Sequence, residues 1–437
     1  MSQRRVAITG LGVVSPLGLG IGEVFDALLA RRCAVKPIGL FDASTFPCRI
    51  GGQLDNFSAG KYVPKSYRKA VKVMARDIEI AVAAADLCVR DSGIVTKGID
   101  EANPTIAPDR LGCNIGAGLI CVDLDELASA VNTAVTDGRF DFAKWGREGM
   151  KNLTPLWLLK YLPNMLSCHV TIIHAAKGPS NTITCGEAGG YLSVGEACRQ
   201  IARGACDAAI AGGAESKLNP MGVLRQTLLG RLNTGANDHP ASACRPFDSA
   251  HAGGVVGEGG GLLMLEELGR AQQRGARIYA EVAGFGAACD PHGCDYLKPT
   301  AAGLDRAITS AMSDADIRPD QIDLVIPNGT AVPAEDRLEA QALHKALGPR
   351  AESVAVVPLA GGSGNLFAAS GAVNLAVAAM AVHKGLVPPA INCDRPDEAC
   401  RLSVPSQSIN QTINYALCGG FAIGGQSGAV VLKRYPA

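Results

Sequence analysis

Two side chains capable of acyl chemistry lie close together in the segment T-C-G-E-A-G-G, residues 184–190. Cys185 offers a thiol and Glu187 a carboxylate, and the segment reads as the bend between a strand and a helix. A thiol at a helix N-terminus is activated, because the helix dipole stabilises the thiolate. Cys185 lies two positions before Glu187, and therefore about 6 to 7 Å back along the strand and away from the helix N-terminus. A cysteine in this setting usually serves as a small buried apolar residue.

Glu187 has two interpretations. As a structural plug, its carboxylate accepts hydrogen bonds from the backbone N–H groups that begin the helix, a favourable place for negative charge. As a catalytic group it suits acyl transfer poorly, since its attack on a thioester would give a mixed anhydride.

The cysteines give little sign of a metal. All 15 are scattered without the close spacing of small disulfide-rich domains, which favours reduced thiols. Cys289, His292 and Cys294 lie close together, but their spacing fits no common zinc pattern. We expect no metal, and no cofactor-binding motif is present.

The elements that must position these side chains alternate between strands and amphipathic helices, a pattern typical of an α/β protein with largely buried sheets. We predict a glycine-rich turn over 10–20 and a buried helix over 366–382, which is interrupted by polar residues and too short to span a membrane. The other predicted elements are strands at 6–9, 208–211, 262–265, 322–326 and 355–358, and helices at 78–89 and 191–203.

Composition excludes several classes of function. The chain has 437 residues, 47% hydrophobic, enough for a large core. Its 41 basic and 41 acidic residues cancel, so the molecule as a whole has no net charge to attract nucleic acid or anionic membranes, and we expect neither as a partner. The N-terminus passes directly into a strand pattern without an export signal, and we expect a cytoplasmic protein.

Several separated motifs resemble the β-ketoacyl synthase family: V-A-I-T-G-L-G-V-V-S-P-L-G at the start, then I-A-R-G-A-C-D-A-A-I-A-G-G-A-E (201–215), R-P-F-D (245–248), G-E-G-G-G-L-L-M-L-E (257–266) and G-L-V-P-P-A-I-N (385–392). Their order across nearly the whole chain makes the resemblance specific. It implies a thiolase-like α/β fold, with two similar halves in a five-layer αβαβα sandwich that dimerises through sheet edges. We divide the halves at 1–255 and 256–437.

The same resemblance shows that the condensing groups are missing. In the family a cysteine nucleophile, two histidines and a lysine carry the reaction, and no catalytic residue is expected here. The acidic residues of the motif N-G-T-A-V-P-A-E-D-R-L-E, Asp336 and Glu339, are retained. The four replaced positions are Glu187 for cysteine, Asn328 and Asn365 for the histidines, and Ala360 for lysine. The two asparagines are neutral donors that can polarise a carbonyl but cannot deliver a proton as histidine does.

The context E-A-G-G is similar to the Q-A-G-G of chain-length factors, the subunits that pair with an active ketosynthase in type II polyketide synthases. This resemblance implies a heterodimer, or a larger assembly, with a cysteine-bearing ketosynthase, and an acyl carrier protein that brings the substrate. The tunnel candidates are Val122, Asp125 and Ser129. The same segment also reads as an ordinary amphipathic helix with Leu124, Leu127 and Val131 in the core.

Two further positions differ from the gate residues of the family, which are bulky aromatic side chains near its nucleophile. Gly254 stands for a bulky aromatic residue, and Ile423 for a gating phenylalanine. Two alternatives to a chain-length subunit stay open. One is a malonyl-carrier-protein decarboxylase, or another altered thioester enzyme, built from Glu187, Asn328 and Asn365; the other is a scaffolding homologue without a tunnel.

Overall fold

The computed structural model describes residues 4–290 and 300–436. The elements follow the predicted alternation of strands and helices over this range. Within these residues, no helix is both long enough and apolar enough to cross a membrane.

The N-terminal half contains five strands in the spatial order β8-β5-β9-β10-β1. β5 runs parallel to β8 and β9, whereas β10 is antiparallel to both β9 and β1. The strands are β1 (Val6–Ser15), β5 (Leu111–Ala117), β8 (Ser180–Thr184), β9 (Ala208–Ser216) and β10 (Glu258–Glu267). β8 pairs only with β5, so its outer edge is free within the described residues.

The C-terminal half repeats this topology. Its spatial order is β13-β12-β16-β17-β11. If the strands of each half are numbered from one to five along the chain, both halves have the same spatial order, 3-2-4-5-1. The strands are β11 (Ala280–Cys289), β12 (Leu324–Pro327), β13 (Ala355–Val356), β16 (Tyr415–Phe421) and β17 (Gln426–Lys433). β1 and β11 pair antiparallel at three positions, which joins the halves.

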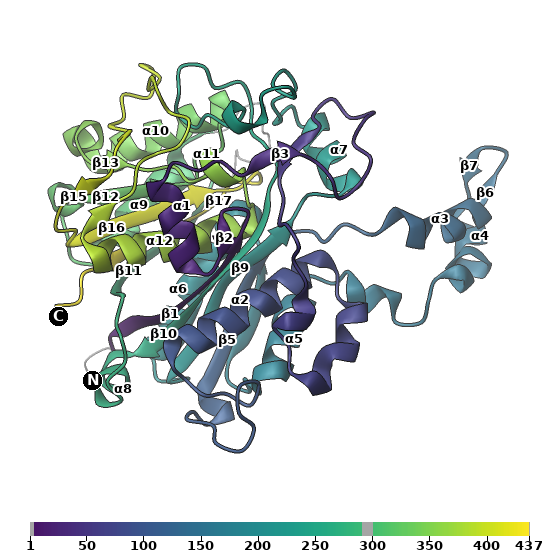
Figure 1. The fold of residues 1–437 in the computed structure, drawn as a ribbon, viewed down its shortest axis with the longest axis horizontal. Coiled ribbons are helices and arrows are strands. Elements are labelled where there is room, and N and C mark those ends of the chain that lie inside the picture. The colour runs from purple at the N-terminus through teal and green to yellow at the C-terminus, as the bar shows by residue number, and fades with distance from the viewer. Residues whose placement is uncertain (1–3, 291–299, 437) are drawn as a thin grey trace.

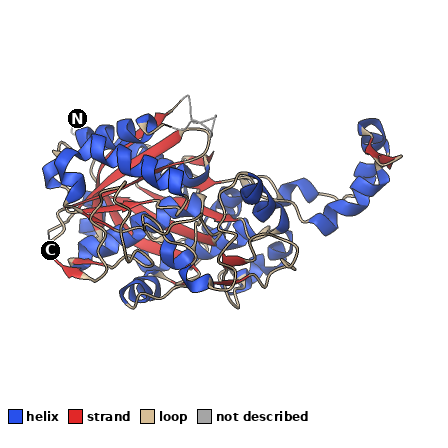
Figure 2. Ribbon diagram, turned by 90° about the horizontal axis from the view of Figure 1, so that it is seen from above, coloured by secondary structure: helices blue, strands red, loops and turns tan. Residues whose placement is uncertain are grey.

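Helices lie on both faces of the strands (Figure 2). α6 (Gly189–Ala202) and α12 (Ala368–Lys384) contact each other and strands of both halves, so they form the central layer. α2 (Arg76–Ser92) and α5 (Met165–His174) cover the outer face of the N-terminal half, and α9 (Ala302–Asp314) and α10 (Pro333–Leu347) that of the C-terminal half. The duplicated topology and the layers confirm the predicted thiolase-like fold.

β10 begins at Glu258 and lies between β1 and β9. The strands of the N-terminal half therefore extend past the boundary drawn from the sequence at 255 and 256. We propose to place the boundary in residues 268–279, between β10 and β11.

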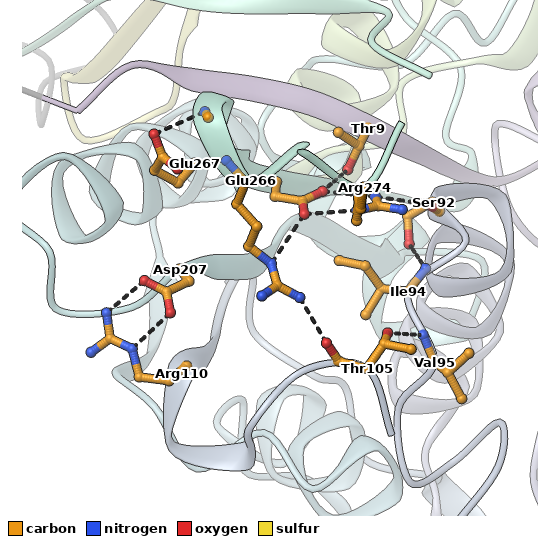
Figure 3. Close-up of polar contacts among 12 residues, drawn as sticks. Thr9, Ser92, Ile94, Val95, Thr105, Arg110, Asp207, Glu266, Glu267 and Arg274 are labelled. Atoms are coloured by element: carbon orange, nitrogen blue, oxygen red, sulfur yellow. Dashed lines mark hydrogen bonds and ion pairs between the residues drawn. The ribbon is translucent and has the colours of Figure 1, made fainter. Parts of the chain in front are cut away.

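The end of β10 is anchored by a fully buried carboxylate (Figure 3). Glu266 accepts hydrogen bonds from Thr9 on β1 at 3.1 Å and from Arg274 at 2.7 Å. Arg270 also donates to Glu266, at 3.2 Å, and to the backbone of Thr105. The bond to Thr9 connects β10, the last strand of the N-terminal half, to β1, its first strand.

The predicted turn over 10–20 is wrong in its first half, because β1 continues to Ser15. Its glycines serve packing instead. A Cβ atom on Gly12 would lie 2.0 Å from the carbonyl oxygen of Ala84, so α2 lies directly against the strand. Only glycine permits so close an approach.

The two central helices also meet through glycines. A Cβ atom on Gly190 would lie 2.7 Å from the backbone nitrogen of Ala372, and one on Gly371 would lie 3.0 Å from that of Tyr191. α12 is buried nearly all round, as its apolar sequence predicts. This close crossing brings the N-termini of α6 and α12 together, and with them the segments that hold Glu187 and Asn365.

A long arm leaves the body between β5 and α5 (Figure 1). It carries α3 (Leu124–Thr133), the hairpin of β6 (Val135–Thr136) and β7 (Arg139–Phe140), and α4 (Phe142–Arg147). Several of its apolar side chains are exposed, including Phe142 and Leu156. The remaining elements are β2 (Gly18–Leu19), α1 (Ile21–Leu29), β3 (Val35–Pro37), β4 (Ile50–Gly52), α7 (Pro220–Leu228), α8 (Leu268–Gln273), α11 (Ala360–Ser363), β14 (Leu386–Val387) and β15 (Ile409–Asn410).

Candidate functional site

Glu187 lies in a single 3-10 turn, Gly186–Ala188, that leads directly into α6. Its side chain is buried. Oε1 accepts hydrogen bonds from Arg231 Nη2 at 2.7 Å and from Asn365 Nδ2 at 3.1 Å. The sequence predicted backbone N–H groups as the partners of this carboxylate. The backbone N–H of Glu187 itself does stabilise the charge, but the hydrogen bonds of 2.7 and 3.1 Å come from side chains of distant segments.

Arg231 is buried as well and links Glu187 to a second carboxylate. Its Nε and Nη2 donate to Glu335 at 2.7 and 2.8 Å, and its Nη1 donates to Gln226 at 3.0 Å. Thr330 donates to Glu335 at 2.8 Å. All three guanidinium nitrogens are therefore engaged, and the arrangement is a buried ion network of one cation between two carboxylates.

The charge state of Glu187 follows from two opposing effects. Burial alone would raise the pKa of its carboxyl group, because a charge is poorly solvated in the protein interior. The positive charge of Arg231 and the hydrogen bonds from Arg231, from the backbone of Glu187 and from Asn365 outweigh burial, so the pKa of Glu187 is lowered. Glu187 is thus ionised at neutral pH. An ionised, paired carboxylate is a poor nucleophile towards a thioester, and it repels the carboxylate of a malonyl group.

Asn365, one of the two predicted histidine replacements, contacts Glu187 directly. Its Oδ1 accepts from the backbone of Phe367 at 2.8 Å and from Ser370 at 3.2 Å, while its Nδ2 donates to Glu187. Both ends of the amide therefore have partners in the protein. Its orientation is set by the bend before α12, where Phe367 has a positive φ of 52°.

Asn328, the other replacement, makes a different set of contacts. Its Nδ2 donates to the carbonyl oxygen of Phe421 at 3.3 Å, and its Oδ1 accepts from the hydroxyl of Tyr191 at 3.2 Å. That hydroxyl accepts from Asn374 at 2.8 Å. Asn328 is thereby part of a hydrogen-bond chain that ties β12 to both central helices.

The retained acidic residues support the backbone around Asn328. Glu339 accepts from the backbone N–H groups of Asn328 and Gly329, each at 2.9 Å. Burial raises the pKa of Glu339 to about 8, although these bonds oppose the shift. Asp336 accepts from the backbone of Phe247 at 2.8 Å. Ala360, at the lysine position, begins α11 and is buried among apolar residues.

Cys185 is half-buried just before the turn that holds Glu187. Burial raises the pKa of its thiol, so the thiol is protonated at neutral pH and lacks the activation that a nucleophile requires. Of the possible metal-binding set, Cys289 ends β11, whereas His292 and Cys294 lie outside the described residues. Over residues 4–290 and 300–436, no group of three metal-binding side chains is found.

Two cavities meet at the ion network. The larger has a volume of about 640 Å³ and is bordered by Glu187, Phe367 and the end of α7. The smaller, about 340 Å³, is bordered by Glu335, Val332 and Phe421. Arg231 and Ile423 line both. The bridge between Glu187, Arg231 and Glu335 therefore forms part of the wall between the two cavities.

The predicted gate positions have separate surroundings. Ile423 is partly exposed where the two cavities adjoin. Gly254 accepts a hydrogen bond from Asn233 and donates one to Arg231 along the backbone, and a Cβ atom there would lie 2.7 Å from the carbonyl oxygen of Thr330. Close backbone packing accounts for glycine at this position.

The tunnel candidates do not border the larger cavity. Val122 packs against the outer core, Asp125 lines a separate groove of about 500 Å³ at the base of the arm, and Ser129 is exposed on α3. Leu124, placed in the core by the alternative interpretation, is exposed. A tunnel role for the three candidates stays a prediction.

Sequence reasoning missed Arg231 and Glu335, the residues that hold Glu187 in place. Glu335 directly precedes the retained Asp336, so it was visible as a charged residue within a recognised motif. Arg231 lies in no motif and is 44 positions from Glu187. Charge balance is the one available signal, since a buried carboxylate requires a cationic partner.

The whole chain is similar to known condensing enzymes. Residues 3–271 match the family "Beta-ketoacyl synthase, N-terminal domain", and residues 279–394 match "Beta-ketoacyl synthase, C-terminal domain". A 3-oxoacyl-[acyl-carrier-protein] synthase 2 from Coxiella burnetii is 35% identical over 437 residues, covering 99% of each chain. The corresponding protein of a Synechocystis species is 33% identical, over 100% of this chain and 99% of its own.

Solved structures agree with the sequence matches. A β-ketoacyl synthase from Burkholderia phymatum superposes with a TM-score of 0.85 at 28% identity, and the ishigamide ketosynthase/chain length factor with a TM-score of 0.84 at 26% identity. Each covers 99% of this chain and 100% of the matched chain. With the duplicated topology, the matched domains and the shared chain length taken together, this protein belongs to the β-ketoacyl synthase family.

Proposed function

We propose that this chain is a non-condensing subunit, a chain-length factor that pairs with a cysteine-bearing ketosynthase in a type II polyketide synthase. One observation supports the proposal: Glu187, at the position where the resemblance predicts the nucleophile, is an ionised carboxylate bound to Arg231 and Asn365 in a buried network. Since each amide that replaces a histidine also has partners in the protein, no described group at this centre is arranged to activate a thioester.

The surface around the larger cavity supports a partner subunit. Leu119 and Leu228 border the cavity and are exposed, Leu228 by 74%. Over the part of the chain that the structure describes, the outer edge of β8 is unpaired, and the arm exposes further apolar side chains. Exposed apolar surface next to a free sheet edge is typical of an interface. A ketosynthase seated there would enclose the cavity, and the two chains would share the space that accepts the growing polyketide.

An acyl carrier protein is the proposed source of the substrate. The relative from Coxiella burnetii is named for its action on acyl-carrier-protein thioesters, and the ishigamide structure is named as a ketosynthase with its chain length factor. A carrier protein would deliver the acyl group to the cysteine of the partner. This chain would limit the length of the product by the shape of the shared cavity.

The test is a reconstitution with and without a cysteine-bearing ketosynthase. The chain alone, incubated with malonyl-carrier protein, should carry no acyl group by intact-protein mass spectrometry and should release no carbon dioxide. The pair should form polyketide, and Glu187→Gln in this chain should leave product formation within about twofold, since glutamine still accepts hydrogen bonds from Arg231 and Asn365. Covalent acylation of the isolated chain would overturn the proposal, and decarboxylation lost in Glu187→Ala would establish the decarboxylase instead.

A further inference from the structure

The larger cavity combines an apolar wall with three cationic and two acidic side chains. Its apolar lining comes from leucines and other hydrophobic side chains, namely Leu119, Pro163, Leu228, Leu229, Phe367, Ala422 and Ile423. Three cationic side chains also border it: Lys217, Arg225 and Arg231. A site for an entirely apolar chain needs no cation, so the partners of these three residues are informative.

Two of the three cations are neutralised within the protein. Arg231 binds Glu187 and Glu335. Lys217 forms an ion pair with Glu215 and donates a hydrogen bond to the carbonyl oxygen of Leu119 at 2.8 Å. Neither is available to an incoming anion without breaking a buried ion pair, which is strongly unfavourable.

Arg225 differs from both. Its Nη1 donates to the sulfur atom of Cys121 at 3.6 Å, a weak acceptor. No carboxylate among residues 4–290 and 300–436 forms an ion pair with its guanidinium group. Arg225 is half-buried on α7, one turn before the exposed Leu228. It therefore presents a charge without an ion-pair partner to a cavity whose other charged side chains are paired with one another.

We propose that this cavity binds an acyl chain whose far end carries a carboxylate, with Arg225 as the residue that pairs with that group. The planar guanidinium matches a carboxylate through two parallel hydrogen bonds, and its contact with an anion strengthens where water is partly excluded. The methylene groups of the ligand would pack on the leucines and Phe367. This inference deepens the proposed function, since it specifies the starter end of the chain that the partner ketosynthase would extend.

Binding of a simple amphipathic acid tests the inference on the full chain without a partner. Decanoate and decan-1-ol have the same number of carbon atoms, but decanoate ends in a charged carboxylate and decan-1-ol in a neutral hydroxyl group. Inorganic phosphate supplies an anion without an alkyl chain. In titration calorimetry at low ionic strength, decanoate should bind at least tenfold more tightly than decan-1-ol, and phosphate should bind more weakly than decanoate. Arg225→Met should remove the preference for decanoate and leave the affinity for decan-1-ol within about twofold.

Two controls keep the result interpretable. Arg318→Met removes a strongly exposed arginine that lines neither cavity and should leave decanoate binding unchanged. If Arg225→Met does not fold, Arg225→Lys keeps the charge but loses the two-pronged geometry, and it should weaken decanoate binding while retaining some preference over decan-1-ol. Equal binding of the acid and the alcohol, no binding of either, or unchanged preference in the Arg225 variants would overturn the inference.

The binding test of Arg225 and the reconstitution test of the proposed function can fail independently of each other. A chain that condenses alone yet binds decanoate through Arg225 would refute the non-condensing role and keep the anion site. A chain that is inert alone but shows no preference for the acid would do the reverse.

Discussion

Arg231 Nη2 lies 2.7 Å from Glu187 Oε1, and both side chains are buried. Glu187 lies in the turn that leads into α6, at the position where the resemblance predicts the family's cysteine. The same guanidinium also holds Glu335, so the cation is bound by two carboxylates. The charge at position 187 is therefore stabilised by side chains from distant segments of the chain, Arg231 and Asn365.

Removal of the central cation should destabilise the fold. Arg231→Met would leave Glu187 buried without its ionic partner, and breaking a buried pair from one side typically lowers the free energy of unfolding by about 3–5 kcal/mol. Urea unfolding followed by circular dichroism measures the change. The double variant Glu187→Gln with Arg231→Met should recover at least half of the loss, because no buried charge remains at position 187. A loss below about 1 kcal/mol in the single variant, similar to that expected for an exposed arginine, would contradict the buried network.

The rim of the larger cavity should govern association with the ketosynthase. Leu228→Lys places a charge at an exposed apolar position beside the cavity, and it should weaken binding of the partner at least tenfold, about 1.4 kcal/mol. Sedimentation analysis of mixtures of the two chains measures the affinity. Val73→Lys is the matched control, since Val73 is 53% exposed but does not border the cavity. Equal effects of the two substitutions would show that another surface holds the partner.

The fold was predictable because its determinants are local and repeated. Glycine motifs, buried strands and the apolar helix near residue 370 each constrain a short segment, and their order along the chain identified the architecture. The extent of β1 was not predictable: Gly10 and Gly12 read as a turn, whereas they lie in a strand that α2 approaches closely. Glycine alone does not distinguish a turn from a close helix–strand contact.

The site was predictable in part for the same reason. Glu187 and Asn365 were expected near one another and share a hydrogen bond of 3.1 Å. The ion network was not foreseen, because Arg231 meets Glu187 and Glu335 only through tertiary folding. The contacts of Asn328 with Tyr191 and Phe421 depend likewise on how β12 packs against the central helices.

Close packing at Gly12 should make this position intolerant of any side chain. Gly12→Ala would force a methyl group to within 2.0 Å of the carbonyl oxygen of Ala84, so α2 or β1 must move. We expect a loss of about 3 kcal/mol in the free energy of unfolding, at the upper end for overpacking. Gly22→Ala is the control, because a Cβ atom on Gly22 has no neighbour within 4 Å and the residue is helical. It should change stability by less than ~1 kcal/mol, and a similar change in both variants would contradict the packing argument.

The buried carboxyl group of Asp77 should make stability depend on pH. Burial raises the pKa of Asp77 to about 7, against the opposing charge of Lys217, whereas an unfolded chain loses this proton near pH 3.8. The folded protein therefore binds a proton that the unfolded chain lacks between about pH 4 and 7. The contribution of Asp77 to stability is complete below pH 4, declines as the pH rises through this window, and is lost above about 7. Asp77→Asn mimics the protonated form and still accepts a hydrogen bond from the backbone of Ser216. The measured quantity is the free energy of unfolding of the variant minus that of the wild type. This difference should grow from pH 4 to 7 by up to ~4 kcal/mol. Asp109→Asn, at an exposed carboxylate, should give no such growth. A difference that stays constant over this range would show that Asp77 titrates as an ordinary surface residue, because a constant offset reports only the packing of the amide.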